Sequence, residues 1–112
     1  RYYDAAAKLI TDDAVIFNNR GKAKFNTNDV AGALADFDRA LQLNPAYDKA
    51  LANRGTARFM QKDYAGAAAD LEKAMPNAGE NAELIKMLAL ANYALNKKDI
   101  AKPYLERAIK AG

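Results

Sequence analysis

The side chains that most often perform catalysis or hold metal ions are scarce in this sequence. The chain contains no histidine and no cysteine. It therefore lacks the commonest general base and transition-metal ligand, and it cannot form disulfides or thiolate zinc sites. Hydrolytic chemistry would require a pair of carboxylates. The nearest acidic groups are Asp12 with Asp13, Asp36 with Asp38, and Asp70 with Glu72.

None of these acidic groups is predicted to form an active site. Asp12 and Asp13 look like helix-capping residues, and the other two groups fall in segments expected to be the outer helices of helix pairs. The glycines at 21, 32, 55 and 66 follow a packing period and do not form a phosphate-binding loop. We therefore predict that the chain is not an enzyme and that it has no cofactor and no metal site.

The charge pattern does not favour nucleic acid as a partner. The formal charge is +3, which is far from the clustered excess typical of nucleic-acid binding. Acidic residues are interleaved with the basic residues near the C-terminus, which are Lys97, Lys98, Lys102, Arg107 and Lys110. No stretch approaches the roughly 18 apolar residues of a membrane-spanning helix, so direct membrane insertion is not expected.

The elements that must position the remaining side chains are predicted to be helices. Hydrophobic residues make up 51% of the chain, alanine is abundant, and only three prolines and six glycines interrupt it. Alanine is the best helix former because it loses no side-chain entropy in a helix. The chain opens at Arg1 without a methionine, so we expect a piece of a longer protein. The absence of cysteine suits the cytoplasm and the bacterial periplasm equally, and the localisation stays open.

The sequence repeats itself with a period of 34 residues. Residues 14–47 and 48–81 are identical at about a dozen aligned positions. The shared positions include Asn19-Arg20-Gly21 with Asn53-Arg54-Gly55, and Ala31-Gly32-Ala33 with Ala65-Gly66-Ala67. A fixed period of this length is typical of helical arrays in which each unit buries its apolar face on the next.

The period and its small residues resemble the tetratricopeptide repeat, in a bacterial-type module. The first full repeat carries the small, aromatic and proline positions of that family at Gly21, Ala33, Phe37, Ala40 and Pro45. The second matches at Gly55, Ala67, Leu71 and Ala74 but has Gly79 where proline is usual. A third, more divergent unit keeps Ala89, Ala101, Leu105 and Ala108.

This resemblance implies an all-α fold, an α-α superhelix (solenoid) of antiparallel helix pairs. We expect a single domain over 1–112. Residues 1–13 would be the second helix of a truncated repeat, and about three repeat units would follow at 14–47, 48–81 and 82–112. Seven helices are predicted, at 2–10, 13–26, 29–43, 47–60, 63–75, 81–96 and 99–111. Pro76 should end the fifth of them early, and an N-cap at Asp99 would leave Pro103 near a first turn.

Several side chains are predicted to have structural roles. Small residues are expected where two helices of a pair approach closely, at Gly21, Ala23, Ala33 and Ala40. Asp29 and Asp63 should cap the second helix of their pairs. Arg20 and Arg54 occupy a usually apolar position in the family, and we expect them to form salt bridges to Asp36 and Asp70.

A binding site is expected on the first helix of each pair, because these helices line the concave groove in the family. The predicted groove residues of the first repeat are Val15, Asn18, Asn19, Lys22, Phe25 and Asn26. Those of the second repeat are Lys49, Ala52, Asn53, Thr56, Phe59 and Met60, and those of the third are Glu83, Lys86, Met87, Leu90, Tyr93 and Ala94.

Asparagine and lysine suggest how the groove would hold a ligand. Asn19 and Asn53 recur one period apart, and an asparagine can accept and donate hydrogen bonds to an extended backbone; alternatively they face water. Lys22 and Lys49 would suit an acidic partner, or are simply solvated. Some family members clamp a C-terminal carboxylate with Lys, Asn and Arg. No clamp is predicted here, because Asn18, Glu83 and Met87 replace the expected basic residues.

Aromatic residues form a second ladder in the predicted groove, at Phe25, Phe59 and Tyr93. They could form side-chain pockets, or they could pack between adjacent helices as core. Met87, Leu90 and Tyr93 make the third repeat more apolar than the first, so the groove is predicted to grade from polar to apolar.

The predicted function is a protein-protein interaction scaffold that binds a peptide or protein segment in the concave groove. The alternative is a self-association or intramolecular stacking module within a larger protein, with no separate peptide ligand. Repeat arrays need capped ends to stay soluble, and apolar residues on the terminal helices could pair molecules into a homo-oligomer. These residues are Tyr2, Tyr3, Leu9, Tyr104, Leu105 and Ile109.

Overall fold

The computed structural model describes residues 2–78 and 81–111, of which residues 2–12, 76–78 and 111 are described by their backbone alone. This part of the chain forms six α-helices. They are α1 (Tyr2–Asn26), α2 (Val30–Leu43), α3 (Asp48–Met60), α4 (Tyr64–Ala78), α5 (Ala82–Ala94) and α6 (Lys98–Ala111). The predicted all-α superhelix is confirmed.

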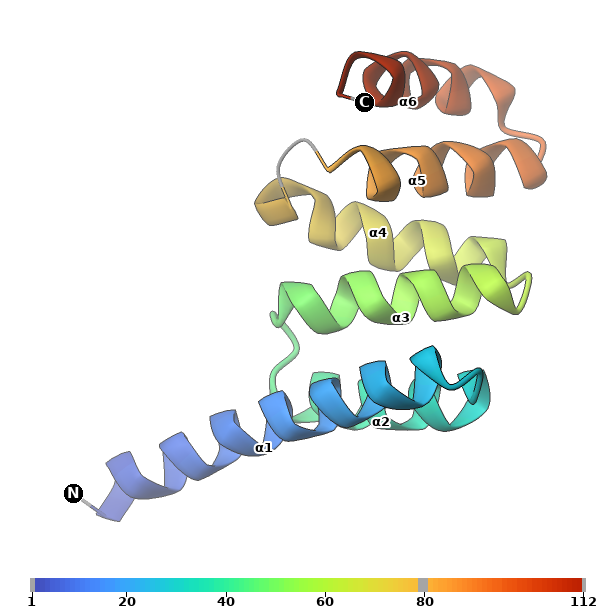
Figure 1. Cartoon of the computed structure of the whole chain (residues 1–112). Coiled ribbons are helices and arrows are strands. Elements are labelled where there is room, and N and C mark those ends of the chain that lie inside the picture. The colour runs from blue at the N-terminus through green and yellow to red at the C-terminus, as the bar shows by residue number, and fades with distance from the viewer. Residues whose placement is uncertain (1, 79–80, 112) are drawn as a thin grey trace.

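The helices form three antiparallel pairs that stack in chain order, with α1 and α6 at opposite ends (Figure 1). The array measures 51 × 28 × 21 Å. Within the array, α2 packs against α3, and α4 packs against α5. The first helices also contact one another, α1 with α3 and α3 with α5. This stacking distributes the core along the array between successive pairs.

Small residues allow the close approach of the two helices in a pair. A Cβ atom built at Gly21 would lie 2.7 Å from the Phe37 ring, and one at Gly55 would lie 2.9 Å from Cγ of Leu71. Ala33 and Ala40 are fully buried. Ala23 was predicted to belong to this set, but it is exposed. Its counterpart one period later packs against α2 of the preceding pair, and no described helix precedes α1.

Each pair turns through one residue in the left-handed conformation. Asn28, Lys62 and Asn96 lie one period apart, with φ angles of 70°, 66° and 64°. The predicted caps of the following helices are confirmed in two repeats. The Oδ1 atom of Asp29 accepts a hydrogen bond of 3.0 Å from the Gly32 N–H, and Asp63 accepts one of 3.1 Å from Gly66.

Four predicted helix boundaries are wrong. The separate helices at 2–10 and 13–26 are one helix, α1, because neither proline nor glycine separates them. Helix α4 continues through Pro76 to Ala78, since a proline this close to the end removes a single backbone donor. Helix α5 ends at Ala94, two residues earlier than predicted. Helix α6 begins at Lys98, so Asp99 lies in its first turn and Pro103 lies inside it.

Ion pairs to buried aspartates join the helices within the first two pairs, as predicted from the arginines. Arg20 Nε and Nη2 donate to the two carboxylate oxygens of Asp36 at 2.9 and 2.7 Å. Arg54 Nε and Nη2 likewise donate to the two carboxylate oxygens of Asp70, at 2.9 and 2.8 Å. A second cation reaches each carboxylate: Lys24 lies 3.2 Å from Asp36, and Arg58 Nη1 donates to Asp70 at 3.0 Å.

These pairs differ in burial and in reach. Asp36 and Asp70 are both buried, at 3% and 2% exposed, but the side chain of Arg20 is 54% exposed and that of Arg54 is 19% exposed. Hydrogen bonding to Arg20 lowers the pKa of Asp36 although its burial acts in the opposite direction, and bonding to Asp70 raises the pKa of Arg54. Arg54 also donates to Asp38 on α2 at 3.0 Å. That bond crosses from one pair to the next, so the second ion network links two repeats.

The third pair replaces this network with apolar packing. The positions of Arg54 and Asp70 are occupied one period later by Leu88 and Tyr104. Leu88 is fully buried, and Tyr104 packs on the same apolar cluster. Asn92 replaces the second cation, and its amide donates to the Leu88 carbonyl at 3.0 Å.

Candidate functional site

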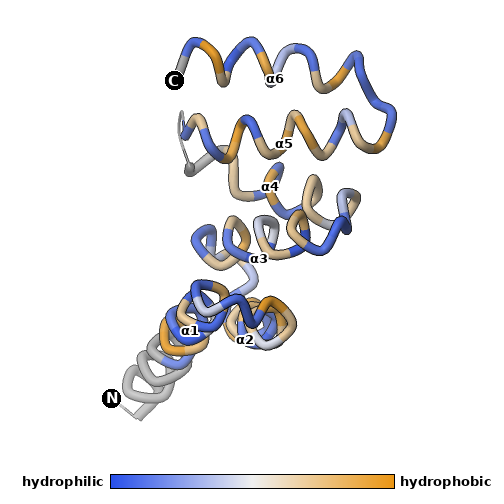
Figure 2. Tube along the Cα trace, turned by 45° about the vertical axis from the view of Figure 1, so that its right-hand side comes forward, coloured by the Kyte–Doolittle hydropathy of each residue, from blue (hydrophilic) through white to orange (hydrophobic). Residues whose placement is uncertain are grey.

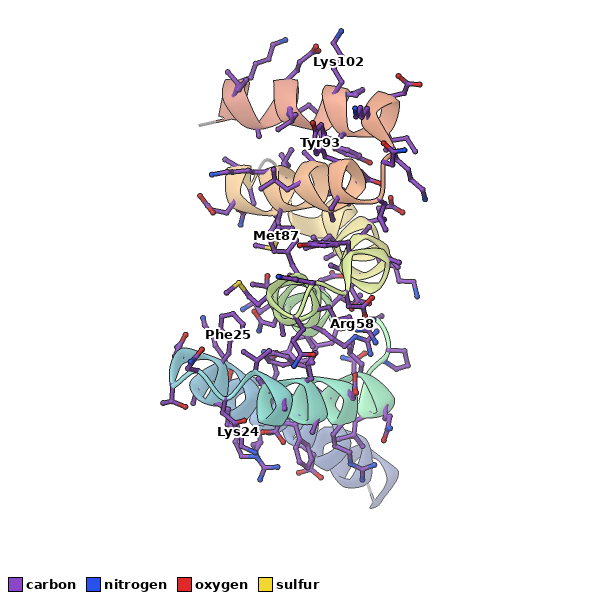
Figure 3. All side chains as sticks on the ribbon, turned by 90° about the vertical axis from the view of Figure 1, so that its right-hand side faces the viewer. Lys24, Phe25, Arg58, Met87, Tyr93 and Lys102 are labelled. Atoms are coloured by element: carbon purple, nitrogen blue, oxygen red, sulfur yellow. The ribbon has the colours of Figure 1, made fainter. Side chains whose placement is uncertain are left out.

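A groove of about 620 Å³ opens along the side of the array formed by the first helices. Most of its lining comes from α1 and α3, and α4 and the start of α5 contribute the rest. The lining residues are Val15, Asn18, Asn19, Lys22, Tyr47, Asp48, Lys49, Ala52, Asn53, Ala74, Asn81 and Leu84. In Figure 3, Phe25 and Met87 point to one side of the stack, whereas Arg58 of the ion network lies on the other.

A pair of asparagines crosses the floor of this groove. Asn53 Nδ2 on α3 donates a hydrogen bond of 3.0 Å to Oδ1 of Asn18 on α1. Asn18 is only 3% exposed, so its side chain joins two helices, although it was predicted as a groove contact. Asn53 is half-buried. One of its amide hydrogens and its carbonyl oxygen have no partner among the described residues.

Among the charged residues that line the groove, cations outnumber acids by two to one. Lys22 and Lys49 line it from α1 and α3 and are exposed. Neither forms an ion pair with another described residue. Asp48 supplies one negative charge to the same lining. Asn19 is exposed, and its side chain makes no hydrogen bond within the described part of the chain. This lining could donate hydrogen bonds to carbonyl or carboxylate oxygens.

A smaller cavity of about 150 Å³ continues along α1 and α3. Its lining includes Phe25, Asn26 and Thr56 beside Lys22 and Asn53. The Thr56 hydroxyl donates to the Ala52 carbonyl at 2.9 Å, within its own helix. The predicted residues of the first two repeats, up to Thr56, therefore lie together.

The aromatic ladder divides between core and surface. Phe25 and Phe59 are half-buried against core clusters, and the Phe59 ring meets Tyr64 edge-on at 5.4 Å. Tyr93 is 55% exposed, and the Lys98 ammonium lies 5.6 Å from its ring centroid. Phe25 and Phe59 therefore pack on the core, with Phe25 also lining the smaller cavity, whereas Tyr93 lies at the surface.

The predicted third-repeat residues lie outside the lining of both cavities. Met87 is half-buried and packs against α4. Leu90 is 40% exposed, and Met60, at the end of α3, is 60% exposed. Lys86 and Glu83 are exposed. The polar groove is thus formed by the first two repeats, and exposed apolar residues lie on the C-terminal halves of α3 and α5.

Several lining residues were not predicted. Tyr47 and Asn81 stand immediately before the first helices of the second and third pairs, one period apart. Asn81 also caps α5, accepting hydrogen bonds from the Glu83 and Leu84 N–H groups. Both residues lie inside helices predicted at 47–60 and 81–96, but they differ in type and neither occupies a position that faces the groove in the family, so neither was included.

The described residues contain neither a metal-binding cluster nor a membrane-spanning helix. No group of three or more acidic, histidine or cysteine side chains is placed to hold a metal ion there. None of the described helices combines the length and apolar character that crossing a membrane requires.

Comparison with known proteins gives a consistent result. One tetratricopeptide repeat model matches residues 14–47, and a second matches residues 82–111. No curated protein matches the sequence. Among solved structures, the chain is similar to YrrB, a tetratricopeptide repeat protein with an unusual peptide-binding site. The identity is 28% and the TM-score 0.83 over 100% of this chain, which spans 58% of that one.

Two further structures share the fold at lower identity. The second tetratricopeptide repeat domain of Spaghetti, bound to an HSP90 peptide, has 21% identity and a TM-score of 0.85, covering 96% of this chain and 99% of that one. The N-terminal domain of stress-induced protein-1 from C. elegans has 22% identity and a TM-score of 0.75, covering 91% and 86%.

Proposed function

The chain belongs to the tetratricopeptide repeat family, and from that premise we propose that its groove between α1, α3 and α5 binds a protein or peptide segment. The fold is a protein-interaction fold, and we propose binding without catalysis. The observation that carries the proposal is the 620 Å³ groove, whose lining includes polar side chains with no partner in the described chain. YrrB is a relative with a peptide-binding site, and that likeness supports the same use here.

The free polar atoms suit an extended backbone. Asn19 offers a carbonyl oxygen and two N–H groups, and Asn53 retains one N–H and its oxygen after bonding to Asn18. A peptide backbone presents alternating N–H and C=O groups, so such amides can hold it whatever its sequence. Preformed donors and acceptors also reduce the entropic cost of binding.

The lysines bias the groove toward an acidic ligand. The lining contains two positive charges, on Lys22 and Lys49, and one negative charge, on Asp48. A carboxylate on the ligand would gain a charge-assisted hydrogen bond from either ammonium group. We propose a segment with at least one acidic side chain or a carboxyl terminus beside these lysines, without the full carboxylate clamp.

Selection from a random linear peptide library provides the test. Selected peptides would be measured by calorimetry against the wild type and against a Lys22→Ala/Lys49→Ala variant. The control, Lys73→Ala/Lys110→Ala, removes the same charge from α4 and α6. We expect about a tenfold loss of affinity or more in the groove variant and little change in the control. Equal affinity of the wild type and the groove variant would show that the selected peptides do not bind beside these lysines.

A further inference from the structure

The face of α6 that ends the array exposes apolar positions that are buried in the interior pairs. Leu105 is 36% exposed, whereas its counterparts Phe37 and Leu71 are 1% and 0% exposed. Ile109 is 78% exposed, whereas Leu41 at the same repeat position is 7% exposed and Met75 is half-buried. In α2 and α4 these positions pack with residues of the following pair. Figure 2 shows hydrophobic and hydrophilic residues alternating along α6.

At the opposite end of the array, α1 exposes positions that are buried in α3. Ala50 and Ala57 on α3 are fully buried because α2 packs on them. One period earlier, Ile16 is 58% exposed, and Ala23 is exposed as well. Thus α1 presents to solvent the face that α3 uses to dock on the preceding pair.

The charges at the two ends repeat an interior ion pair. Arg54 on α3 binds Asp38 on α2 at 3.0 Å, across the junction between two pairs. The residue one period before Arg54 is Arg20, on α1. The residue two periods after Asp38 is Glu106, on α6. Arg20 is 54% exposed and Glu106 is exposed. The two ends of the array therefore carry an arginine and an acidic residue at the positions that form the Arg54–Asp38 ion pair inside it.

From these equivalences we propose that the chain binds a second copy of itself head to tail, with α1 of one copy docked on α6 of another as α3 docks on α2. One chain supplies both faces, and both the apolar positions and the Arg20–Glu106 pair match the interior junction. An interface between two different faces is heterologous, so it extends into chains of copies and does not stop at a dimer. This inference stands independently of the proposed peptide groove.

One residue works against the contact and limits its strength. Lys102 occupies the position of Leu34 and Ala68, which pack into the interior junctions. An ammonium group at an apolar interface costs desolvation unless its stem covers the surface and its head reaches water. Replacing Lys102 with leucine should therefore tighten self-association about tenfold.

Sedimentation velocity of single and mixed variants tests the proposal. Ile109→Asp blocks the α6 face and Ala23→Glu blocks the α1 face, both at exposed positions. Ala69→Asp introduces a similar charge on the exposed side of α4 and serves as control. Circular dichroism would establish that each variant keeps the helical content of the wild type.

The expected pattern is specific to a heterologous interface. The wild type and Ala69→Asp should grow beyond dimers as concentration rises, and each blocked variant alone should be monomeric. A mixture of the two blocked variants should form a one-to-one complex, because each retains one intact face. A wild type that stays monomeric at its highest soluble concentration, with Lys102→Leu also monomeric, would overturn the proposal. So would an Ala23→Glu variant that still dimerises, since that result indicates an α6–α6 contact.

Discussion

The side-chain amide of Asn53 on α3 donates a hydrogen bond of 3.0 Å to the side-chain carbonyl of Asn18 on α1, a residue that is 3% exposed. The bond joins the first helices of two successive repeats at the floor of the groove. Asn53 is therefore both a structural residue and a groove residue, whereas Asn19, its counterpart one period earlier, is exposed and available to a ligand.

Substitution of Asn53 should test the structural part of this assignment. Asn53→Ala leaves the buried Asn18 carbonyl without its partner, so we expect a loss of about 1–3 kcal/mol in the free energy of unfolding. Asn19→Ala should change it by less than about 0.5 kcal/mol. Urea denaturation measures both. In a double-mutant cycle, Asn18→Ala and Asn53→Ala should show coupling, and strict additivity would contradict the bond.

Removal of the Asp70 carboxylate should destabilise the array strongly. Asp70→Ala leaves Arg54 and Arg58 without their shared partner, and their side chains are only 19% and 29% exposed. We expect a loss of about 3 kcal/mol, the lower end for a broken buried pair. Asp38→Ala is the matched control, because Asp38 is 49% exposed and should cost about 1 kcal/mol or less. Equal losses would show that burial of Asp70 has no energetic consequence.

The Arg20–Asp36 pair predicts a particular acid sensitivity. The guanidinium of Arg20 holds the pKa of Asp36 below its ordinary value of 3.8. A carboxyl with a lowered folded-state pKa contributes stability that is complete above the unfolded pKa and is lost as the pH falls through the folded pKa. The stability gap between the wild type and Asp36→Asn should therefore be constant near neutral pH and narrow below about pH 4. Urea denaturation at a series of pH values measures it, and a gap that widens on acidification would contradict the sign.

Replacement of Pro103 should stabilise α6. This proline lies inside the helix, where it cannot donate to the Asp99 carbonyl and its ring crowds that group. Pro103→Ala should raise the free energy of unfolding by about 1–3 kcal/mol. Pro45→Ala, in the turn between α2 and α3, should give no gain, because a proline in a compatible turn restricts the unfolded chain. Thermal denaturation compares the two variants, and a larger gain at Pro45 would contradict this account.

The repeat period predicted the features that recur. The close helix approach at Gly21, the Asp29 and Asp63 caps, and the arginine–aspartate pairs were all predicted, because each depends on contacts within one repeat. The predicted first-helix residues from Val15 to Thr56 line the two adjoining cavities, whereas Phe59 and Met60 do not. Contacts within one repeat follow from the spacing of residues along the chain, so they can be predicted from the sequence pattern alone.

Features that depend on the neighbouring repeat were harder to predict. Asn18 is buried by contact with α3, where its partner Asn53 lies 35 residues further along the chain. Ala23 is exposed because no helix precedes α1 among the described residues. A break had been expected at residues 11 and 12, between the predicted helices at 2–10 and 13–26, but Asp12 and Asp13 are a weaker signal than proline or glycine. For self-association, the side chains of Tyr2, Tyr3 and Leu9 lie outside the described residues, whereas those of Leu105 and Ile109 are exposed.

A nuclear magnetic resonance titration tests the groove most directly. A library-selected peptide would be added to the ¹⁵N-labelled chain, and the shift of each backbone amide would be followed. We predict that the largest shifts fall on α1 and α3 around Asn19, Lys22, Lys49 and Asn53, with smaller changes on α2, α4 and α6. Largest shifts on the second helices, with the groove amides unmoved, would contradict the claim that the concave side binds the ligand.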